Sequence, residues 1–260
     1  MNEQTKNFAT YFHAVNSGDL IAALPGMREI YRKTGWKAII YQRLNTPGRY
    51  YQGATHPLKD EHGNLVTMNK RMFNLIKPLI VAQDYVQDML EWKGFPERCE
   101  YDLNRIHDGV DIHMPNGSIH RWHWYVYPDM ACDLSERWID VPAHKEFELI
   151  CKDDEDAPFK QMVTTLSDRV LINFTERYRN PSVTYYFLRL FQDRCVFAGT
   201  EDEHKAFCTQ WKLNLPYLRV YNFVELAQAI ADCKFFLGNQ SMCWNIAEGL
   251  KVPRMLYKLS

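Results

Sequence analysis

The spacing of hydrophobic and polar residues changes twice near the start of the chain, and the changes predict a strand, a helix and a second strand. Residues 8–15 are rich in aromatic and β-branched side chains, which is typical of a strand. Over 20–31 apolar side chains recur at helical spacing, and Pro25 predicts a bend or a short first turn. Gly35 can end this helix before a second strand at 36–41. The short connections indicate a βαβ unit, and therefore a parallel sheet.

The middle of the chain has more varied patterns. Turn-forming and charged residues over 45–70 indicate a long loop or an insertion. Residues 69–92 have helical spacing that is interrupted at Pro78. Alternating apolar positions predict a β-hairpin over 109–127. The acidic stretch 152–158, closed by proline, is the best candidate for a linker between domains.

A second series of strands and helices follows the acidic stretch. Strands are predicted at 169–174, 195–199, 217–220, 234–238 and 252–257, and helices at 182–191, from 200 onward, at 223–233 and at 241–250. Both ends of the chain are therefore expected to be α/β. Because ligands of open parallel sheets bind beyond the carboxyl ends of the strands, the loops of interest are 16–19, 175–180, 199–203 and 238–241.

Composition narrows the class of protein. With 260 residues the chain is long for one small domain and short for two large ones, and 46% hydrophobic with 24% charged residues is the balance of a globular protein. A net charge of −1 argues against whole-protein attraction to nucleic acid or anionic lipid, although it leaves room for a local basic patch. We find no transmembrane segment, no signal peptide and no CxxC among seven scattered cysteines, and we therefore expect a cytoplasmic protein with reduced thiols.

Several polar residues in the strand-end loops have two interpretations. Asp19 is either a carboxylate that stabilises the start of a helix or a general base at a cleft. Glu201 is either an ordinary first-turn acid or a partner for ribose hydroxyls. Arg177 and Arg179 are either solvated charges or a bidentate grip on a diphosphate.

The histidines around the predicted hairpin are either metal ligands or packed side chains. His120 and His123 differ by three positions, so on a strand they would point to opposite faces, which favours packing over metal binding. The sequence contains no P-loop, no GxGxxG after a strand, no HExxH and no GxSxG. Simple NTPase, dehydrogenase, zincin and hydrolase functions therefore lose their main support.

Four short motifs occur in the order found in one known family. The segment SGDLIAALPGMR at 17–28 resembles the N-terminal segment of the heptosyltransferase-like glycosyltransferases of family 9, which have the GT-B fold. Residues 196–201 resemble the family's GxxE strand–turn, and 225–227 its ELA helix. Residues 238–241 and 247–253 resemble the two ends of its GNDSGxxHxAxAxxxP segment.

The resemblance implies a fold and an activity. The fold would be α/β, with two facing Rossmann-like domains at 1–160 and 161–260. The first domain would carry the elaboration that contains the hairpin. The activity would be inverting, metal-independent transfer of a sugar from a nucleotide-sugar to an acceptor hydroxyl, with no other cofactor. The acceptor would be a surface glycan, a lipid-linked sugar or a modified nucleobase in DNA. There are two alternatives. One is a non-catalytic protein that binds a nucleotide or glycan, and the other is a nucleotide-sugar epimerase.

The resemblance also implies roles for single residues. In the N-terminal half Asp19 would be the catalytic base, with Ser17 and Gly18 near the donor phosphates. The donor-binding residues of the C-terminal half would be Thr175 and Arg179 at the diphosphate, Glu201 at the ribose, Tyr221 and Asn222 at the nucleobase, and Gln240, Ser241, Met242 and Asn245 around the start of a helix. Gln240, Met242 and Asn245 stand where the family has Asp, Gly and His, which argues against ADP-heptose as the donor.

Overall fold

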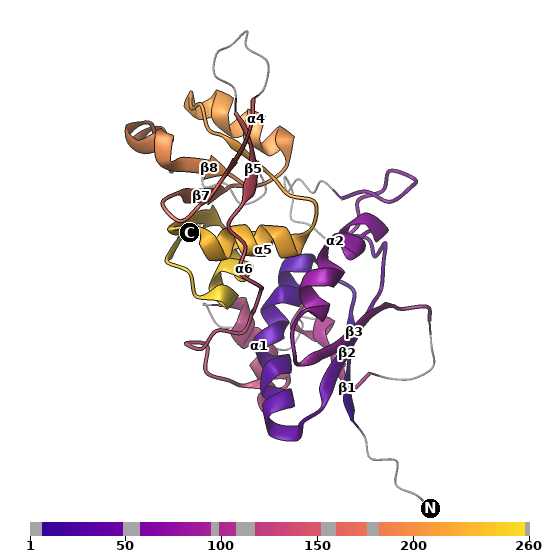
Figure 1. Ribbon diagram of the computed structural model, residues 1–260. Helices are drawn as coiled ribbons and strands as arrows, with labels where there is room; N and C mark the ends of the chain where they lie inside the picture. Colours follow the sequence, from indigo (N-terminus) through magenta and orange to yellow (C-terminus); the bar gives the residue numbers. More distant parts are fainter. Residues whose placement is uncertain are drawn as a thin grey trace, which may run out of the picture. The chain divides into compact units, whose positions relative to one another are not determined.

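The computed structural model describes residues 7–48, 58–94, 99–107, 118–151, 160–175 and 182–257. The chain divides into two units, Met1–Asp140 and Val141–Ser260, each with its own sheet (Figure 1). The predicted boundary at 160 therefore falls inside the second unit, because the strands at 147–151 and 160–164 belong to the second sheet. The predicted linker at 152–158 lies outside the described residues.

The first unit is built on a four-stranded parallel sheet in the order β3-β2-β1-β4. Its strands are β1 (Phe8–His13), β2 (Lys37–Gln42), β3 (Val86–Glu91) and β4 (Tyr101–Asp102). Helix α1 (Ser17–Thr34) connects β1 to β2, and α2 (Lys70–Val81) precedes β3 (Figure 1). The predicted βαβ unit is confirmed, with Phe8 beside Lys37 at the start of the β1–β2 ladder.

Helix α1 continues through Pro25, where a bend or a short first turn was predicted. Proline removes one backbone donor, which normally weakens a helix interior. Here residues 20–27 are all buried, so packing holds this part of the helix in place. The helix ends at Gly35, whose positive φ of 74° and bond to the Tyr31 carbonyl form a left-handed cap.

Two predictions for the middle of the chain are wrong in part. The pattern at 69–92 is helical only in α2, and its second half forms β3, since pairing with β2 satisfies its backbone. The part of the predicted hairpin that the structure describes, from residue 118, is helical instead. It consists of the 3-10 helix η2 (Ile119–Arg121) and the short helix α3 (Trp122–Val126). His120 and His123 are both buried there, and a separation of three places them on one helical face.

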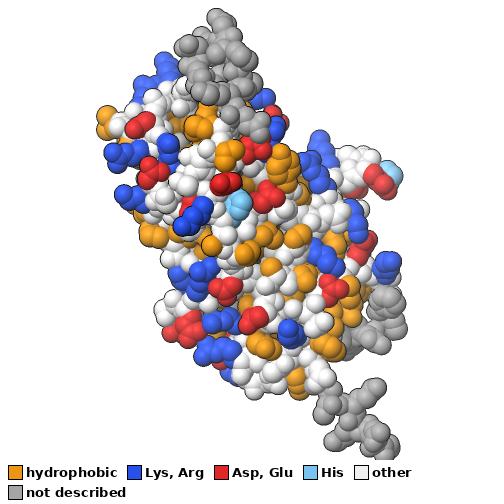
Figure 2. All heavy atoms as spheres, in the orientation of Figure 1, with side chains coloured by type: hydrophobic (Ala, Val, Ile, Leu, Met, Phe, Trp, Pro, Cys, Tyr) orange, Lys and Arg blue, Asp and Glu red, His pale blue; other side chains and the backbone are white. Residues whose placement is uncertain are grey.

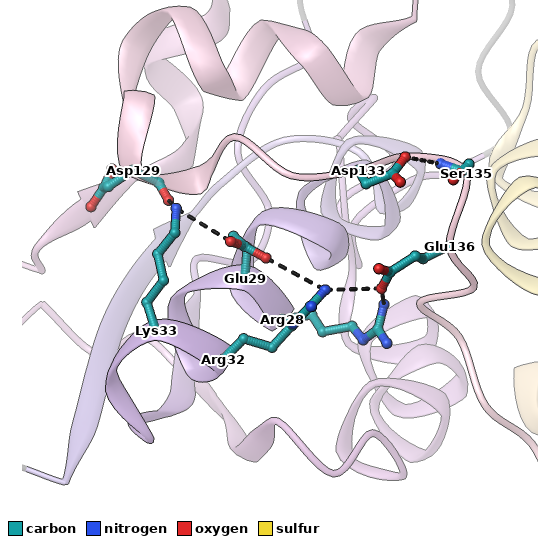
Figure 3. A network of polar contacts seen from close by, with 8 residues as sticks. All are labelled: Arg28, Glu29, Arg32, Lys33, Asp129, Asp133, Ser135 and Glu136. Atoms are coloured by element: carbon teal, nitrogen blue, oxygen red, sulfur yellow. Dashed lines mark hydrogen bonds and ion pairs between the residues drawn. The ribbon is translucent and has the colours of Figure 1, made fainter.

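A charged network joins α1 to the segment that follows α3 (Figure 3). Glu136 accepts from Arg28 at 3.1 Å and from Arg32 at 2.9 Å, and Lys33 donates to the Asp129 carbonyl at 2.7 Å (Figure 3). Asp129 belongs to the 3-10 helix η3 (Pro128–Met130), and its carboxylate accepts from the Tyr101 hydroxyl at 2.6 Å. These contacts fix the segment 128–136 against one side of α1.

The second unit has a seven-stranded sheet in the order β11-β10-β7-β8-β9-β5-β6. Its strands are β5 (Phe147–Cys151), β6 (Lys160–Thr164), β7 (Val170–Asn173), β8 (Cys195–Phe197), β9 (Tyr217–Arg219), β10 (Phe235–Asn239) and β11 (Arg254–Tyr257). Strand β5 runs antiparallel to both of its neighbours, β6 and β9, and the ladders from β11 to β9 are parallel.

The helices of the second unit follow the predicted order. They are α4 (Glu201–Trp211), α5 (Phe223–Asp232) and α6 (Met242–Leu250). The helix predicted at 182–191 is instead a 3-10 helix, η5 (Tyr186–Arg194), with a kink at Phe191. The aromatic rings of Phe174, Tyr185 and Phe207 pack together in the core of this unit. Across the described parts of both units, no helix is long and apolar enough to cross a membrane.

Candidate functional site

The order of strands in each sheet marks one place where a ligand can enter. In the first sheet the chain moves from β1 to β2 and β3 on one side, and then to β4 on the other side. In the second sheet β8 and β9 lie on one side of β7, and β10 and β11 on the other. In open α/β sheets, ligands commonly bind beyond the carboxyl ends of the two strands at which the order reverses. These places lie between β1 and β4, and between β7 and β10.

Asp19 lies at the first of these places, in the first turn of α1 directly after β1. Its Oδ2 is 3.4 Å from Nε2 of His107, which ends the 3-10 helix η1 (Leu103–His107) directly after β4. The side chain of Asp19 is 13% exposed and that of His107 is 40% exposed. Two side chains that are far apart in sequence therefore meet because β4 pairs with β1.

The charge state of Asp19 follows from these neighbours. Burial acts to raise its pKa, but the hydrogen bond and charge of His107, with smaller contributions from His13 and His123, outweigh burial. The pKa of Asp19 therefore lies below its usual value, and the carboxylate is ionised at neutral pH. An ionised carboxylate at a helix N-terminus is also favoured by the helix dipole.

Two further histidines lie close enough to Asp19 to interact with it electrostatically. Burial lowers the pKa of His13 to about 4 and that of His123 to about 3, so both rings are neutral at pH 7. His13 Nδ1 lies 2.6 Å from Gln42 Oε1, whereas His13 Nε2 and both nitrogens of His123 have no hydrogen-bond partner among the described residues. His13 and His123 are therefore uncharged neighbours of Asp19 at pH 7, with few hydrogen bonds to the described residues.

The second place, between β7 and β10, is organised by two buried asparagines. Asn239, at the end of β10, accepts from the Thr175 backbone at 3.1 Å and donates to the Thr175 carbonyl at 2.7 Å. Asn173, at the end of β7, donates to the Ala198 carbonyl at 2.7 Å and accepts from Ser241 Oγ at 2.8 Å. These bonds tie the loops after β7, β8 and β10 together at one edge of the sheet.

Close packing at this edge requires small residues. A Cβ added to Gly238 would lie 2.9 Å from the Asn173 carbonyl oxygen, and one added to Gly199 would lie 2.9 Å from the Phe197 ring. Beyond Gly238 the structure places Gln240, half-buried, and then Ser241 before the start of α6. Helix α6 begins at Met242. The first backbone N–H groups of a helix have no acceptor within the helix, and such an end is suited to an anion.

The other predicted donor residues of this unit have structural partners. Asn222 caps α5 by accepting from the Val224 and Glu225 backbones at 2.9 and 3.0 Å. Tyr221 is 64% exposed, with its hydroxyl 3.3 Å from Glu148. Glu201 is in the first turn of α4. A capping box formed by Thr200 and Glu203 stabilises the start of this helix. Asn245 is buried inside α6.

The structure brings some of the predicted residues together and leaves others apart. Thr175 donates to Asn239 and Ser241 donates to Asn173, at the ends of the paired strands β10 and β7. Ser17 and Gly18 share the first turn of α1 with Asp19. Arg177 and Arg179 lie outside the described residues. Within the described ranges, no group of three His, Cys, Asp or Glu side chains could hold a metal ion.

His107, Asn173 and Asn239 are site residues that the sequence motifs did not indicate. The two asparagines follow buried apolar runs at the ends of β7 and β10, which is a signal that could have been found in the sequence. The role of His107 depends on the β1–β4 pairing and leaves no local signal.

On the face that Figure 2 shows, basic and acidic side chains are interspersed, so neither sign of charge dominates the surface. This agrees with a net charge of −1. On this face, a broad electrostatic attraction to a polyanion has no support.

Comparison with known proteins identifies the fold. No protein-family model and no curated protein matches the sequence. Among solved structures, a family 9 glycosyl transferase from Veillonella parvula DSM 2008 matches with a TM-score of 0.51 and 10% identity, over 98% of this chain and 81% of that chain. The ADP-heptose lps heptosyltransferase II of E. coli matches with a TM-score of 0.50 and 13% identity, over 96% and 84% of the two chains. The fold is thus like that of the family 9 heptosyltransferases, as the sequence motifs predicted.

Proposed function

We propose that this chain is a glycosyltransferase that moves a sugar from a nucleotide-sugar to an acceptor hydroxyl, with inversion and without a metal ion. The observation that carries the proposal is Asp19, an ionised carboxylate at the strand-order reversal of the first sheet, in a segment that resembles the family 9 motif. The similarity of fold to family 9 glycosyltransferases supports it.

The donor would bind to the second unit. Its diphosphate would lie at the N-terminus of α6, near Gln240, Ser241 and Met242, where backbone N–H groups and the helix dipole favour negative charge. Thr175 and the two arginines that follow it in the sequence, 177 and 179, would neutralise the charge that develops on the leaving diphosphate. Asn245 would support this edge from inside α6.

The nucleoside would extend along the neighbouring loops of the same sheet edge. Glu201, at the start of α4, would accept from the ribose hydroxyls. Tyr221 would offer its exposed ring to the nucleobase, beside Asn222, which fixes the start of α5. This placement follows the sheet order, because α4 and α5 follow the adjacent strands β8 and β9.

The acceptor would bind to the first unit, at the N-terminal end of α1. Asp19 would be the base that takes the proton from the acceptor hydroxyl, and Ser17 and Gly18 share the first turn of α1 with it. The acceptor would be a glycan, a lipid-linked sugar or a nucleobase hydroxyl.

A binding protein without catalysis is the second candidate. It is favoured by one specific observation: Gln240, Met242 and Asn245 occupy the positions of the family's Asp, Gly and His at the donor edge. Such a protein would bind a nucleotide or nucleotide-sugar and leave it unchanged.

A ligand screen followed by a turnover assay tests the proposal. The panel would contain ADP, UDP, GDP and their hexose conjugates, together with ADP-heptose, because the similar E. coli protein is named for that donor. Each compound is scored by thermal shift, and each binder is then tested for release of nucleoside diphosphate. Binding with turnover supports the transferase, binding without turnover supports the second candidate, and no binding contradicts both.

A further inference from the structure

The 3-10 helix η5 of the second unit presents three large apolar side chains to solvent. Leu190 is 87% exposed, Tyr186 47% and Phe187 38%. Leu188 of the same helix is fully buried in the core of the unit, so the three exposed side chains lie on other sides of η5. Exposed apolar side chains that gather in one place, rather than singly, commonly mark a surface for another molecule.

An open cavity adjoins this cluster. Its volume is about 310 Å³, and its lining comes from the end of η5 and from the starts of β7 and β10: Asp168, Val170, Phe191, Arg194, Lys234 and Phe235. Phe191 connects the two features, because its ring centroid is 6.2 Å from that of Phe187. The three exposed side chains and the cavity therefore form one surface, which we call the η5 surface.

Two cations of the cavity have no partner among the described residues. Arg194, the last residue of η5, and Lys234, which directly precedes β10, make no ion pair and no side-chain hydrogen bond with them. Both residues are exposed. Val170, Phe191 and Phe235 supply apolar walls beside the two charges. The cavity is thus suited to an anionic group that is attached to an apolar body.

The other charges near the η5 surface leave it basic. The Arg189 guanidinium lies over the Tyr186 ring, 5.0 Å from its centroid. Asp193 is the one acid of η5, and Asp168, at the cavity, is 3.6 Å from the Nε of Arg169. The cations therefore outnumber the acids here, and this part of the protein attracts anions although the whole chain has a net charge of −1.

The η5 surface lies at the opposite end of the strands from the candidate donor edge. Val170 and Phe235 are the first residues of the parallel strands β7 and β10, whereas Asn173 and Asn239, which organise the donor edge, are their last residues. A large molecule bound at the η5 surface would therefore leave the donor edge open.

The kinds of side chain on this surface match the layers of a lipid bilayer. Leu190 is aliphatic and the most exposed, which suits the hydrocarbon side of the interface. Aromatic rings such as those of Tyr186 and Phe187 suit the boundary between hydrocarbon and headgroups. Cations beside them attract the phosphates of anionic lipids.

A stable contact with a second copy of the chain would need a larger apolar surface. Such interfaces bury about 800 Å² on each partner. Even a fully buried aromatic side chain contributes only about 150–250 Å², and the rings of Tyr186 and Phe187 are each less than half exposed. A bilayer has no such minimum area, because electrostatic attraction to anionic lipids adds to the apolar contact.

We propose that the η5 surface docks on a bilayer that contains anionic phospholipid. Leu190 inserts below the level of the phosphates, Tyr186 and Phe187 lie at the interface, and Arg194 and Lys234 bind lipid phosphates at the cavity. With one short apolar segment and a few cations, the docking is reversible. The proposal does not depend on sugar transfer.

The test measures co-sedimentation of the full chain with two kinds of vesicle. One is phosphatidylcholine alone, and the other is an equal mixture of phosphatidylcholine and phosphatidylglycerol. Wild type should bind the mixed vesicles and be released by high salt. Leu190→Ser should raise the apparent Kd about 10- to 100-fold, and Arg194→Gln combined with Lys234→Gln about 10- to 30-fold. Val163→Ser, which changes a 63% exposed apolar side chain on β6, should match wild type.

A second readout needs no variant. Hydrogen exchange of wild type should slow in peptides that span η5 when mixed vesicles are added, and should not change in peptides of α1. Wild type that stays in the supernatant, equal affinity for the two kinds of vesicle, or wild-type binding by Leu190→Ser would overturn the proposal. A dimer of the free protein that Leu190→Ser abolishes in light scattering would also overturn it, because the η5 surface would then belong to a second copy.

Discussion

Replacing His123 with leucine is expected to reduce the loss of stability that the first unit suffers in acid. His123 is buried, and its pKa is lowered from 6.5 to about 3 because burial penalises the charged ring. In the unfolded chain the ring is free to bind a proton below pH 6.5. The unfolded state therefore binds more protons between these values, and the free energy of unfolding falls as the pH falls through this window.

The magnitude follows from the two pKa values. Between about pH 8 and about pH 5, a ring that titrates at 6.5 when unfolded and near 3 when folded costs about 2 kcal/mol of stability. His13, whose pKa is lowered to about 4, adds about 2 kcal/mol over the same range. A combined loss of about 4 kcal/mol is a large part of the stability of an ordinary domain.

Leucine is a suitable replacement because neither nitrogen of His123 has a hydrogen-bond partner among the described residues. His123→Leu should thus keep its stability near pH 8 and lose about 2 kcal/mol less than wild type at about pH 5. Urea unfolding followed by tryptophan fluorescence at both pH values measures the difference, and hydrogen exchange of β1 peptides assigns the transition to the first unit. His62→Gln serves as the exposed control. Equal acid losses in His123→Leu and wild type would refute the claim that the folded state keeps this ring neutral.

Three other substitutions test the packing around the site. Gly26→Ala would bring a Cβ to 2.5 Å from Met130 Cε, so thermal unfolding should show a loss of about 1–3 kcal/mol that Met130→Ala partly relieves; no loss would refute the close approach. Glu136→Gln removes the ion pairs with two arginines of α1, and urea unfolding should show a cost of at most about 1 kcal/mol that high salt abolishes; a cost that persists in salt would point to a different role. Asn239→Ala leaves the backbone of the loop after β7 without its partners, so it should cost about 1–3 kcal/mol and weaken nucleotide binding in a thermal-shift titration; unchanged binding would separate this network from the donor edge.

The elements that the sequence predicted well are those in which local signals agree. In 8–41 a β-branched run, a helical apolar face and Gly35 as a cap all favour the same strand–helix–strand unit, and the structure contains it. Strand β3 was not predicted because Val86–Glu91 is short and its apolar positions also fit a helix. The segment is a strand because it pairs with β2. The segment from residue 118 was misread for a similar reason, since aromatic residues are common in both strands and buried helices.

The sequence predicted only those site residues whose position follows from the neighbouring residues in the chain. Asp19 follows a strand and begins a helix, so the sequence alone placed it at a carboxyl end. His107 joins it through a two-residue strand paired with β1, and nothing within either segment indicates that contact. The asparagine network is intermediate: each asparagine has a local position at a strand end, but their shared partners depend on the strand order.

We propose that this chain transfers a sugar from a nucleotide-sugar and that the transfer requires Asp19. Proton NMR of the anomeric signal of a bound donor, followed over time, tests it most directly. We predict that the signal decays with wild type, that a product of opposite anomeric configuration forms first, and that Asp19→Asn still binds the donor but leaves it intact. A donor that is bound but unchanged by wild type, or consumed equally by Asp19→Asn, would contradict the account.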